Sequence, residues 1–200
     1  LGSSDSVDTD ITNNKGDYDM WVVNITNAGS IVWQKNFGGS EIDLGYSIAP
    51  TSDGNFIVTG DTRSTDQDVS TALGNADVWA AKISATGTII WEKSYGGSQF
   101  ESARSITPMS NGFYAICASS RSNNVNVTAN FGVNDAWMLI IDNEGSLLFE
   151  KNMGGSGLDF AEGIIETSDQ KIVVVGNTDS SDINFAQNKG GKDAFFIKIK

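Results

Sequence analysis

The 200-residue chain contains no histidine, one cysteine and two prolines. Without histidine there can be no Ser-His-Asp triad, no Cys-His pair and no histidine metal ligand. The single cysteine, Cys117, excludes an internal disulfide framework. Its position in a sequence repeat matches Thr59 and Val175, which predicts a small core-filling side chain rather than a reactive thiol.

Basic residues are also scarce. The chain has 13 Lys and Arg against 25 Asp and Glu, which gives a formal net charge of -12. An acidic surface repels phosphate backbones and anionic lipids, so no nucleic acid partner is expected. No apolar run approaches the roughly 18 residues needed to cross a bilayer, so no membrane insertion is expected either. The chain begins Leu1-Gly2, with neither methionine nor a signal peptide, which predicts a fragment or a processed piece.

What the chain does contain is a repeat of 58 residues. An Asp-x-aromatic motif and a Gly-Gly pair both recur at this spacing, and a fixed period of this size is typical of repeat architectures. The whole chain, 1–200, is therefore predicted to be one repeat region with units at about 1–39 (partial), 40–97, 98–155 and 156–200 (partial). The motifs begin at Asp19, Asp77, Asp135 and Asp193, and the glycine pairs begin at Gly38, Gly96 and Gly154.

Each unit is predicted to form four short strands. In the central unit these are 103–107, 113–118, 135–141 and 147–153, with a long polar loop over 119–134. Short apolar runs bounded by Gly, Asn, Asp and Ser indicate strands, and no helical periodicity is sustained. The glycines at the two short turns are predicted to adopt positive φ: Gly29, Gly87 and Gly145 on one hairpin, and Gly54 and Gly112 on the other.

The third and fourth strands are apolar at successive positions, as in Ile89-Ile90-Trp91. Such strands need cover on both faces, and four-stranded sheets stacked around an axis supply it. We therefore predict an all-β fold, a β-propeller with one unit per blade, with a flat β-solenoid as the alternative. The predicted 13 strands do not close into a ring. The chain is therefore expected to be an arc of about 3.5 blades from a ring of roughly six to eight.

Three motifs point to a known repeat: the Asp-x-Trp start, the segment W-x-K-x-(aromatic)-G-G-S, and the hairpin S-D-G-N-F-I-V-T-G at 52–60. Over essentially the whole chain they resemble the bacterial secreted β-propeller repeat, of the SBBP type. Similar repeats occur in large surface and secreted proteins of Bacteroidetes-type bacteria. The resemblance implies a propeller and an extracellular or cell-surface location, but it implies little about the ligand.

The long loops carry oxygen-bearing side chains at positions i and i+2. Two such oxygens suit a hard cation, so Ca²⁺ is one prediction, although the full calcium-loop pattern with its glycine and glutamate is missing. The alternative is a set of Asx-turns that hold the loops in place. The candidate ligands are Asp8, Asp10, Asp66, Asp68, Asp182 and Asn184, with Asn124 and Asn126 in the remaining unit.

A second acidic series, Asp43, Glu101 and Asp159, lies four residues after each second glycine. Paired carboxylates can hydrolyse glycosides, so an alternative function is a glycan-acting enzyme that uses Glu101, Asp159 or Glu162. Catalysis needs an acid distinct from a base, whereas this carboxylate recurs in every unit. A structural role is therefore predicted, with backbone N–H groups or the recurring Lys35, Lys93 and Lys151 as partners. The motif aspartates are predicted to fix the entry to the third strand.

Ligand binding is predicted where the repeat varies. One position of the first strand holds Tyr46, Arg104 and Glu162, and a loop position holds Asp5, Arg63, Arg121 and Asp179. We take Tyr46, Arg63, Arg104, Arg121 and Glu162 as the candidate ligand-binding residues. The tryptophans, by contrast, recur regularly and are predicted to lie in the core between blades.

The leading functional prediction is a non-catalytic module that acts in adhesion, ligand binding or display through its long-loop face. Its partners are expected to be a protein or glycan ligand. Further repeats of a parent chain, or another copy, are expected to close the ring. Besides the glycan-acting enzyme, a purely structural spacer remains an alternative.

Overall fold

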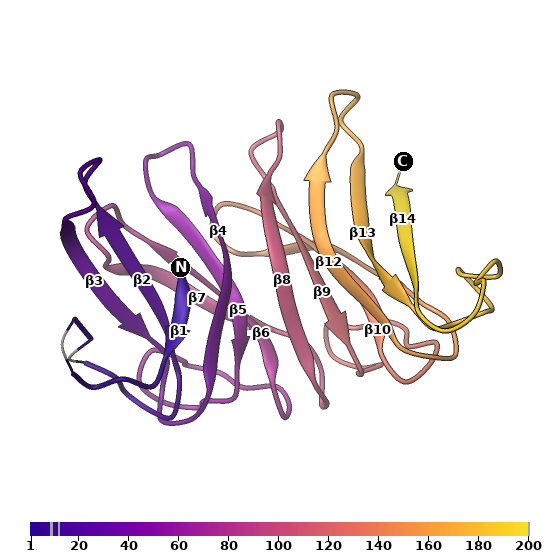
Figure 1. The fold of residues 1–200 in the computed structure, drawn as a ribbon, viewed down its shortest axis with the longest axis horizontal. Coiled ribbons are helices and arrows are strands. Elements are labelled where there is room, and N and C mark those ends of the chain that lie inside the picture. The colour runs from indigo at the N-terminus through magenta and orange to yellow at the C-terminus, as the bar shows by residue number, and fades with distance from the viewer. Residues whose placement is uncertain (9, 12, 200) are drawn as a thin grey trace.

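The computed structural model describes residues 1–8, 10–11 and 13–199, and its regular elements are all β-strands. Within these residues there is no helix that could span a bilayer. Fourteen antiparallel strands form four sheets that follow one another along the chain (Figure 1).

The first sheet contains β1 (Gly2–Ser4), β2 (Asp19–Ile25) and β3 (Ile31–Phe37). The second contains β4 (Asp43–Pro50), β5 (Phe56–Thr62), β6 (Asp77–Ile83) and β7 (Ile89–Tyr95). The third contains β8 (Glu101–Pro108), β9 (Tyr114–Ser120), β10 (Asp135–Ile141) and β11 (Leu147–Met153). The fourth contains β12 (Asp159–Glu166), β13 (Ile172–Thr178) and β14 (Asp193–Ile199).

The predicted all-β class is confirmed, and β10 and β11 have the predicted bounds. The predicted count of 13 strands is wrong. Gly2–Ser4 forms an additional strand because it pairs with β2 in register, Gly2 opposite Trp21 and Ser4 opposite Asp19. The N-terminal segment is therefore the end of a second strand that keeps its place in the sheet.

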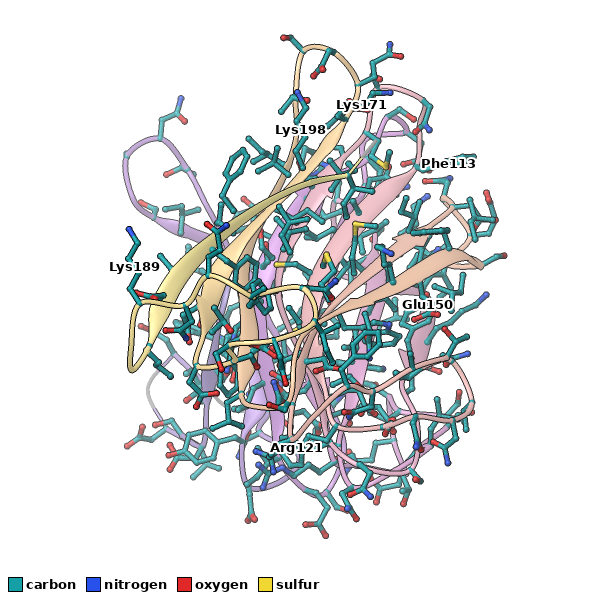
Figure 2. All side chains as sticks on the ribbon, turned by 90° about the vertical axis from the view of Figure 1, so that its right-hand side faces the viewer. Phe113, Arg121, Glu150, Lys171, Lys189 and Lys198 are labelled. Atoms are coloured by element: carbon teal, nitrogen blue, oxygen red, sulfur yellow. The ribbon has the colours of Figure 1, made fainter. Side chains whose placement is uncertain are left out.

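The sheets are stacked so that β4, β8 and β12 lie side by side. The hairpins that join β2 to β3, β4 to β5, β8 to β9 and β12 to β13 lie toward the upper end of the view in Figure 1, and the long loops that lead into β6 and β10 lie toward the lower end. We call these the hairpin end and the long-loop end. In Figure 2, Phe113 and Lys171 lie at the hairpin end, whereas Arg121 lies at the long-loop end.

Three hydrophobic cores separate the four sheets. In each core the aromatic residue of one Asp-x-aromatic motif packs against the preceding sheet. Trp79 of β6 shares a core with Met20 and Val22 of β2. Trp137 of β10 packs in the same way with β6, and Phe195 of β14 with β10. Trp79 and Trp137 are fully buried, so the predicted core role is confirmed for both.

Cys117 fills a position in the core between the third and fourth sheets, as predicted. It is fully buried, and this burial raises the pKa of its thiol to about 12. The thiolate is therefore scarcely populated near neutral pH, which fits a side chain that packs rather than reacts.

The prediction that third and fourth strands are both covered on two faces is correct only for β6 and β10, the third strands of the two inner sheets. Every residue of β6 is buried, but the fourth strands are partly exposed: Ile90 of β7 is 51% exposed and Leu148 of β11 is 48% exposed. The fourth strand is the outer edge of its sheet, so one side of it faces solvent. The second strand occupies a central place instead, and β9 is buried along its full length.

Candidate functional site at the long-loop end

The long loops of the second, third and fourth sheets are each hydrogen-bonded to the Gly-Gly-Ser turn that follows the last strand of the preceding sheet. In the second sheet, Oδ1 of Asp66 accepts a hydrogen bond from the Ser40 N–H at 2.8 Å, and Oδ2 of Asp68 accepts one from the Gly38 N–H at 3.2 Å. The Asp68 N–H in turn donates to the Gly38 carbonyl at 3.2 Å. The same pairs of bonds recur in the next two units, from Asn124 and Asn126 to the Ser98 and Gly96 amides, and from Asp182 and Asn184 to the Ser156 and Gly154 amides.

These bonds give the loop residues a structural role, but they reach the preceding Gly-Gly-Ser turn and are not the predicted local Asx-turns. A carboxylate and an amide oxygen perform the same task in different units, because both accept a hydrogen bond from backbone N–H. Asp8 and Asp10 of the first unit are exposed. Within the described part of the chain, no group of three or more Cys, Asp or Glu side chains is arranged to hold a metal ion. The calcium site stays a prediction.

A fully buried carboxylate lies under each Gly-Gly turn. Oε2 of Glu101 accepts a hydrogen bond from the Gly97 N–H at 2.7 Å, and Oε1 accepts one from Ser120 Oγ at 2.8 Å and another from the Ser122 N–H at 3.2 Å. Asp43 and Asp159 occupy the same position, each bonded to the second turn glycine and to two hydroxyl groups. This outcome agrees with the predicted structural role. Among the described residues, however, no lysine forms an ion pair with these carboxylates.

The motif aspartate supplies a second buried carboxylate at each turn. Oδ2 of Asp77 accepts hydrogen bonds from the Leu73 and Gly74 amides at 2.7 and 3.2 Å, at the entry to β6. Its Oδ1 is buried without a hydrogen-bond partner, as are Oδ1 of Asp19 and of Asp135. A Cβ placed on Gly96 would lie 2.6 Å from Asp77 Oδ1 and 2.5 Å from Glu101 Oε2. The first turn glycine is therefore required, because it lies against both carboxylates.

Burial raises the pKa of the three fully buried motif aspartates, Asp19, Asp77 and Asp135. The pKa of Asp135 rises to about 6, mainly by desolvation and further through the negative charge of Asp159. Burial also raises the pKa of Asp19 and of Asp77, with smaller contributions from Asp43 and Glu101 respectively. Two acids packed at one turn cannot both ionise freely, so the motif position holds a proton more readily than an exposed aspartate.

Two of the three carboxylates predicted for glycan chemistry are not accessible to a sugar. Glu101 and Asp159 are fully buried and hydrogen-bonded to the protein. Glu162 is exposed, and its Oε1 accepts a hydrogen bond from Nδ2 of Asn177 at 3.2 Å. The glycan-acting enzyme therefore stays a prediction to which these side chains lend no support.

The three variable residues of the first strand are all β-bulge residues. In the pairing of β4 with β5, Gly45 lies opposite Gly60 and Ser47 opposite Thr59, so Tyr46 has no partner. Arg104 of β8 and Glu162 of β12 are the extra residues at the same place in their sheets. A bulge bends the strand and redirects the unpaired side chain, and bulges are common next to binding sites.

Four of the five candidate ligand-binding residues meet in one cavity of about 290 Å³. Tyr46, Arg63, Arg104 and Arg121 all line it, whereas Glu162 does not. The cavity includes every arginine of the chain. It is formed by strands and loops of the second and third sheets, with Phe160 of the fourth, and Figure 2 shows Arg121 at the long-loop end.

Aromatic rings cover the faces of the guanidinium groups. Arg63 and Arg121 lie over the ring of Phe100, with Cζ 5.1 and 5.8 Å from its centroid, and Arg104 lies 4.2 Å from the centroid of Tyr46. Stacking of this kind stabilises the position of an arginine without using its N–H groups.

Asp61 is the acidic residue of the cavity wall. It is 2% exposed and accepts a hydrogen bond from Ser102 Oγ at 2.5 Å. Desolvation raises the pKa of its carboxyl, although Ser102, Arg104 and Arg63 act in the opposite direction. Asp61 gives the cavity a hydrogen-bond acceptor among its cationic groups.

Phe100, Asp61 and Ser102 were not among the predicted site residues. A signal for them exists in the repeat. The position of Phe100 holds Ile42 and Leu158 in other units, and that of Asp61 holds Ser119 and Asn177. At these positions the residue type changes from one unit to the next, as it does at the positions of the predicted site residues. Variation between units is therefore the signal that could have identified them.

No protein-family model matches the chain, and comparison with curated proteins gave no match either. The function proposed below therefore follows from the geometry of the chain itself.

Proposed function

We propose that the chain is a non-catalytic ligand-binding module, an arc of a β-propeller from a secreted or surface-exposed bacterial protein. One observation carries the proposal: four residues at positions where the repeat varies line a single cavity, whereas the recurring carboxylates and aromatic residues hold the scaffold. Tyr46, Arg63, Arg104 and Arg121 come from separate strands and loops and line the same space. Loops and strand ends fixed by a rigid scaffold are the usual carriers of binding sites.

The uncovered faces of the two terminal sheets support the propeller arc. Phe196 of β14 is 67% exposed, whereas Ala80 and Met138, at the same repeat position, are 0% and 1% exposed. At the other end of the stack, Ile25 of β2 is 58% exposed, whereas its equivalent Ile83 is fully buried. An apolar sheet face of this kind is covered by a neighbouring sheet everywhere else in the molecule. Further sheets, from a parent chain or another copy, would complete the ring.

The bacterial and extracellular part of the proposal rests on the resemblance to the SBBP-type repeat, whose motifs span the chain. Adhesion and display are the roles that fit a rigid arc with one ligand-bearing end. The burial of Glu101 and Asp159 leaves the glycan-acting alternative without two of its three candidate carboxylates.

The proposal is tested by probing the immobilised chain with glycan and peptide arrays, alongside an Arg104→Ala variant. We expect a bound ligand whose signal falls in the variant, and no cleavage of any array compound. A signal that Arg104→Ala leaves unchanged would contradict a site at this cavity. Light scattering tests the arc separately: a monodisperse monomer that melts cooperatively would contradict uncovered faces that need a further sheet.

A further inference from the structure

We propose that the cavity lined by Arg63, Arg104 and Arg121, here called the arginine pocket, binds a small hydroxylated oxyanion such as a sugar acid or a sugar phosphate. The inference rests on the proposed function and names the ligand class of that site. The shared chemistry is one negatively charged oxygen group, a carboxylate or a phosphate, on a scaffold with hydroxyl groups.

The hydrogen-bonding edges of the three guanidinium groups are the first feature that points to an anion. Among the residues that the structure describes, none of the three forms an ion pair with a carboxylate. Arginine presents N–H donors in a planar fork that matches carboxylate and phosphate oxygens in pairs. Since the rings of Phe100 and Tyr46 cover guanidinium faces, the edges remain for a ligand.

The charge of the arginine pocket opposes that of the rest of the molecule. Three arginines face one acidic residue, Asp61, in a chain whose net charge is -12. Lys192 adds a further positive charge nearby, 5.1 Å from the ring of Phe160, which also lines the pocket. Two of the guanidinium groups share the ring of Phe100, so like charges are held close together. An anion between them would relieve this repulsion.

The size of the pocket and the polar residues of its wall indicate what the uncharged part of the ligand is like. A volume of about 290 Å³ lies at the lower end of the range for small-molecule sites, which suits a monosaccharide-sized group rather than a polymer segment. Asp61 and Ser102 line the pocket beside the arginines and offer oxygen atoms to hydroxyl groups. A ligand with an oxyanion and neighbouring hydroxyls would use both kinds of group.

Isothermal titration calorimetry tests the proposal with three probes at low and at physiological salt: glucuronate, glucose 6-phosphate and glucose. We expect one or both of the anions to bind and glucose not to bind. Binding of glucuronate alone would identify a carboxylate ligand, and binding of glucose 6-phosphate alone would identify a phosphate ligand. Failure of both anions to bind at millimolar concentration would overturn the proposal.

Matched variants separate a built site from general charge. Arg104→Ala and Arg121→Ala should each weaken anion binding about tenfold or more, because a charge-assisted pair of hydrogen bonds is lost. Arg104→Lys keeps the charge but loses the fork, and should fall between wild type and Arg104→Ala. Lys171→Ala removes the same charge at the opposite end of the molecule and should leave affinity unchanged (Figure 2).

An equal loss in Lys171→Ala would overturn the proposal, since it would show attraction without a site. Circular dichroism and thermal unfolding confirm that each variant is folded. If glucose binds as tightly as the anions and Arg104→Ala weakens it, the oxyanion class is wrong although the site of the proposed function stands. If nothing on the arrays or in calorimetry depends on Arg104, both proposals fail together.

Discussion

The two ends of the sheet stack are stabilised by different interactions. At the long-loop end, fully buried carboxylates such as Glu101 accept hydrogen bonds from backbone amides and hydroxyls of the turns and loops. At the hairpin end, two ion pairs join a lysine of a third strand to an aspartate of a hairpin turn in the same sheet. In the pair of Lys82 with Asp53 the lysine is buried, whereas the side chains of Lys198 and Asp169 are 40% and 57% exposed. The arginine pocket therefore lies at the end where buried carboxylates bond the turns and loops together.

This difference follows from the cost of burying charge. A buried carboxylate must be satisfied by hydrogen bonds, and removing it leaves several buried donors unpaired at once. An exposed ion pair is screened by water and contributes little. Substitutions of the same type should therefore have unequal effects at the two ends.

The largest effect is expected from Glu101→Ala. The Gly97 and Ser122 amides and the Ser120 hydroxyl lose their common acceptor, so the free energy of unfolding should fall by about 3 kcal/mol or more. Glu166→Ala is the matched control, because Glu166 accepts a hydrogen bond from the Ser110 N–H in a hairpin and is not fully buried. Its loss should stay below about 1 kcal/mol in urea unfolding. Equal losses of unfolding free energy in the two variants would contradict the conclusion that the two ends are stabilised differently.

A smaller effect is expected from pH. The pKa of Asp135 in the folded chain is about 6, above the unfolded value of roughly 3.9, so the folded state binds the proton more tightly. The stability from this group is complete below about pH 4 and is lost as the pH rises through about 6. The unfolding midpoint should therefore rise as the pH is lowered from 7.5 to 5. The exposed Asp169, whose pKa is lowered to about 2, acts in the opposite direction only at more acidic pH.

Asp135→Asn tests the assignment of this pH dependence. The amide resembles the protonated acid, so the variant should be more stable than wild type at pH 7.5 by about 1–2 kcal/mol. The unfolding midpoint of the variant should also rise less than that of wild type when the pH is lowered from 7.5 to 5. The remaining dependence should come from Asp19 and Asp77, whose pKa values are raised in the same way. A wild-type midpoint that falls steadily from pH 7.5 to 5 would be incompatible with these three acids.

Asp66 allows a test of the loop contacts and of calcium together. Asp66→Asn keeps an oxygen for the Ser40 amide, as Asn124 does for Ser98, so the midpoint should hardly change. Asp66→Ala removes the acceptor and should lower stability by about 0.5–1 kcal/mol. The measurement is thermal unfolding with millimolar Ca²⁺ and with chelator. A midpoint raised by Ca²⁺ in wild type but not in Asp66→Asn would establish the cation site instead.

The smallest effect is expected at the hairpin end. Asp169→Ala breaks the exposed ion pair with Lys198, and the unfolding midpoint should stay unchanged near neutral pH because water screens both charges. A clear loss in this variant, measured beside Glu101→Ala, would show that the hairpins contribute more than their exposure suggests.

The strands and turns could be predicted because the 58-residue period marks the same turn in successive units. Gly87 and Gly145 adopt positive φ as predicted, at 76° and 75°. Gln170, which replaces a turn glycine in the last unit, adopts a φ of 57°. A tight turn depends on the residue type at one or two positions, and the recurrence of that residue type every 58 residues identifies the turn in the sequence.

The candidate site was only partly predictable, because its geometry is tertiary. The variation at Tyr46 and Arg104 can be read from the sequence, but no sequence signal predicts the β-bulges that redirect these side chains. The contact between Arg63 and Phe100 joins two different sheets, and no spacing in the chain specifies it. The paired burial of Asp135 and Asp159 is likewise a property of the packed turn.

The way in which the sheets pack also gives the stack a direction. Each sheet presents the face that carries its motif aromatic, such as Trp79, to the sheet before it, and the opposite face to the sheet after it. The two faces left uncovered, one at Ile25 and one at Phe196, are therefore unlike. A two-fold axis would bring like faces together, so it cannot reproduce this packing. Only head-to-tail addition can, and each unit added in this way leaves the same two faces free.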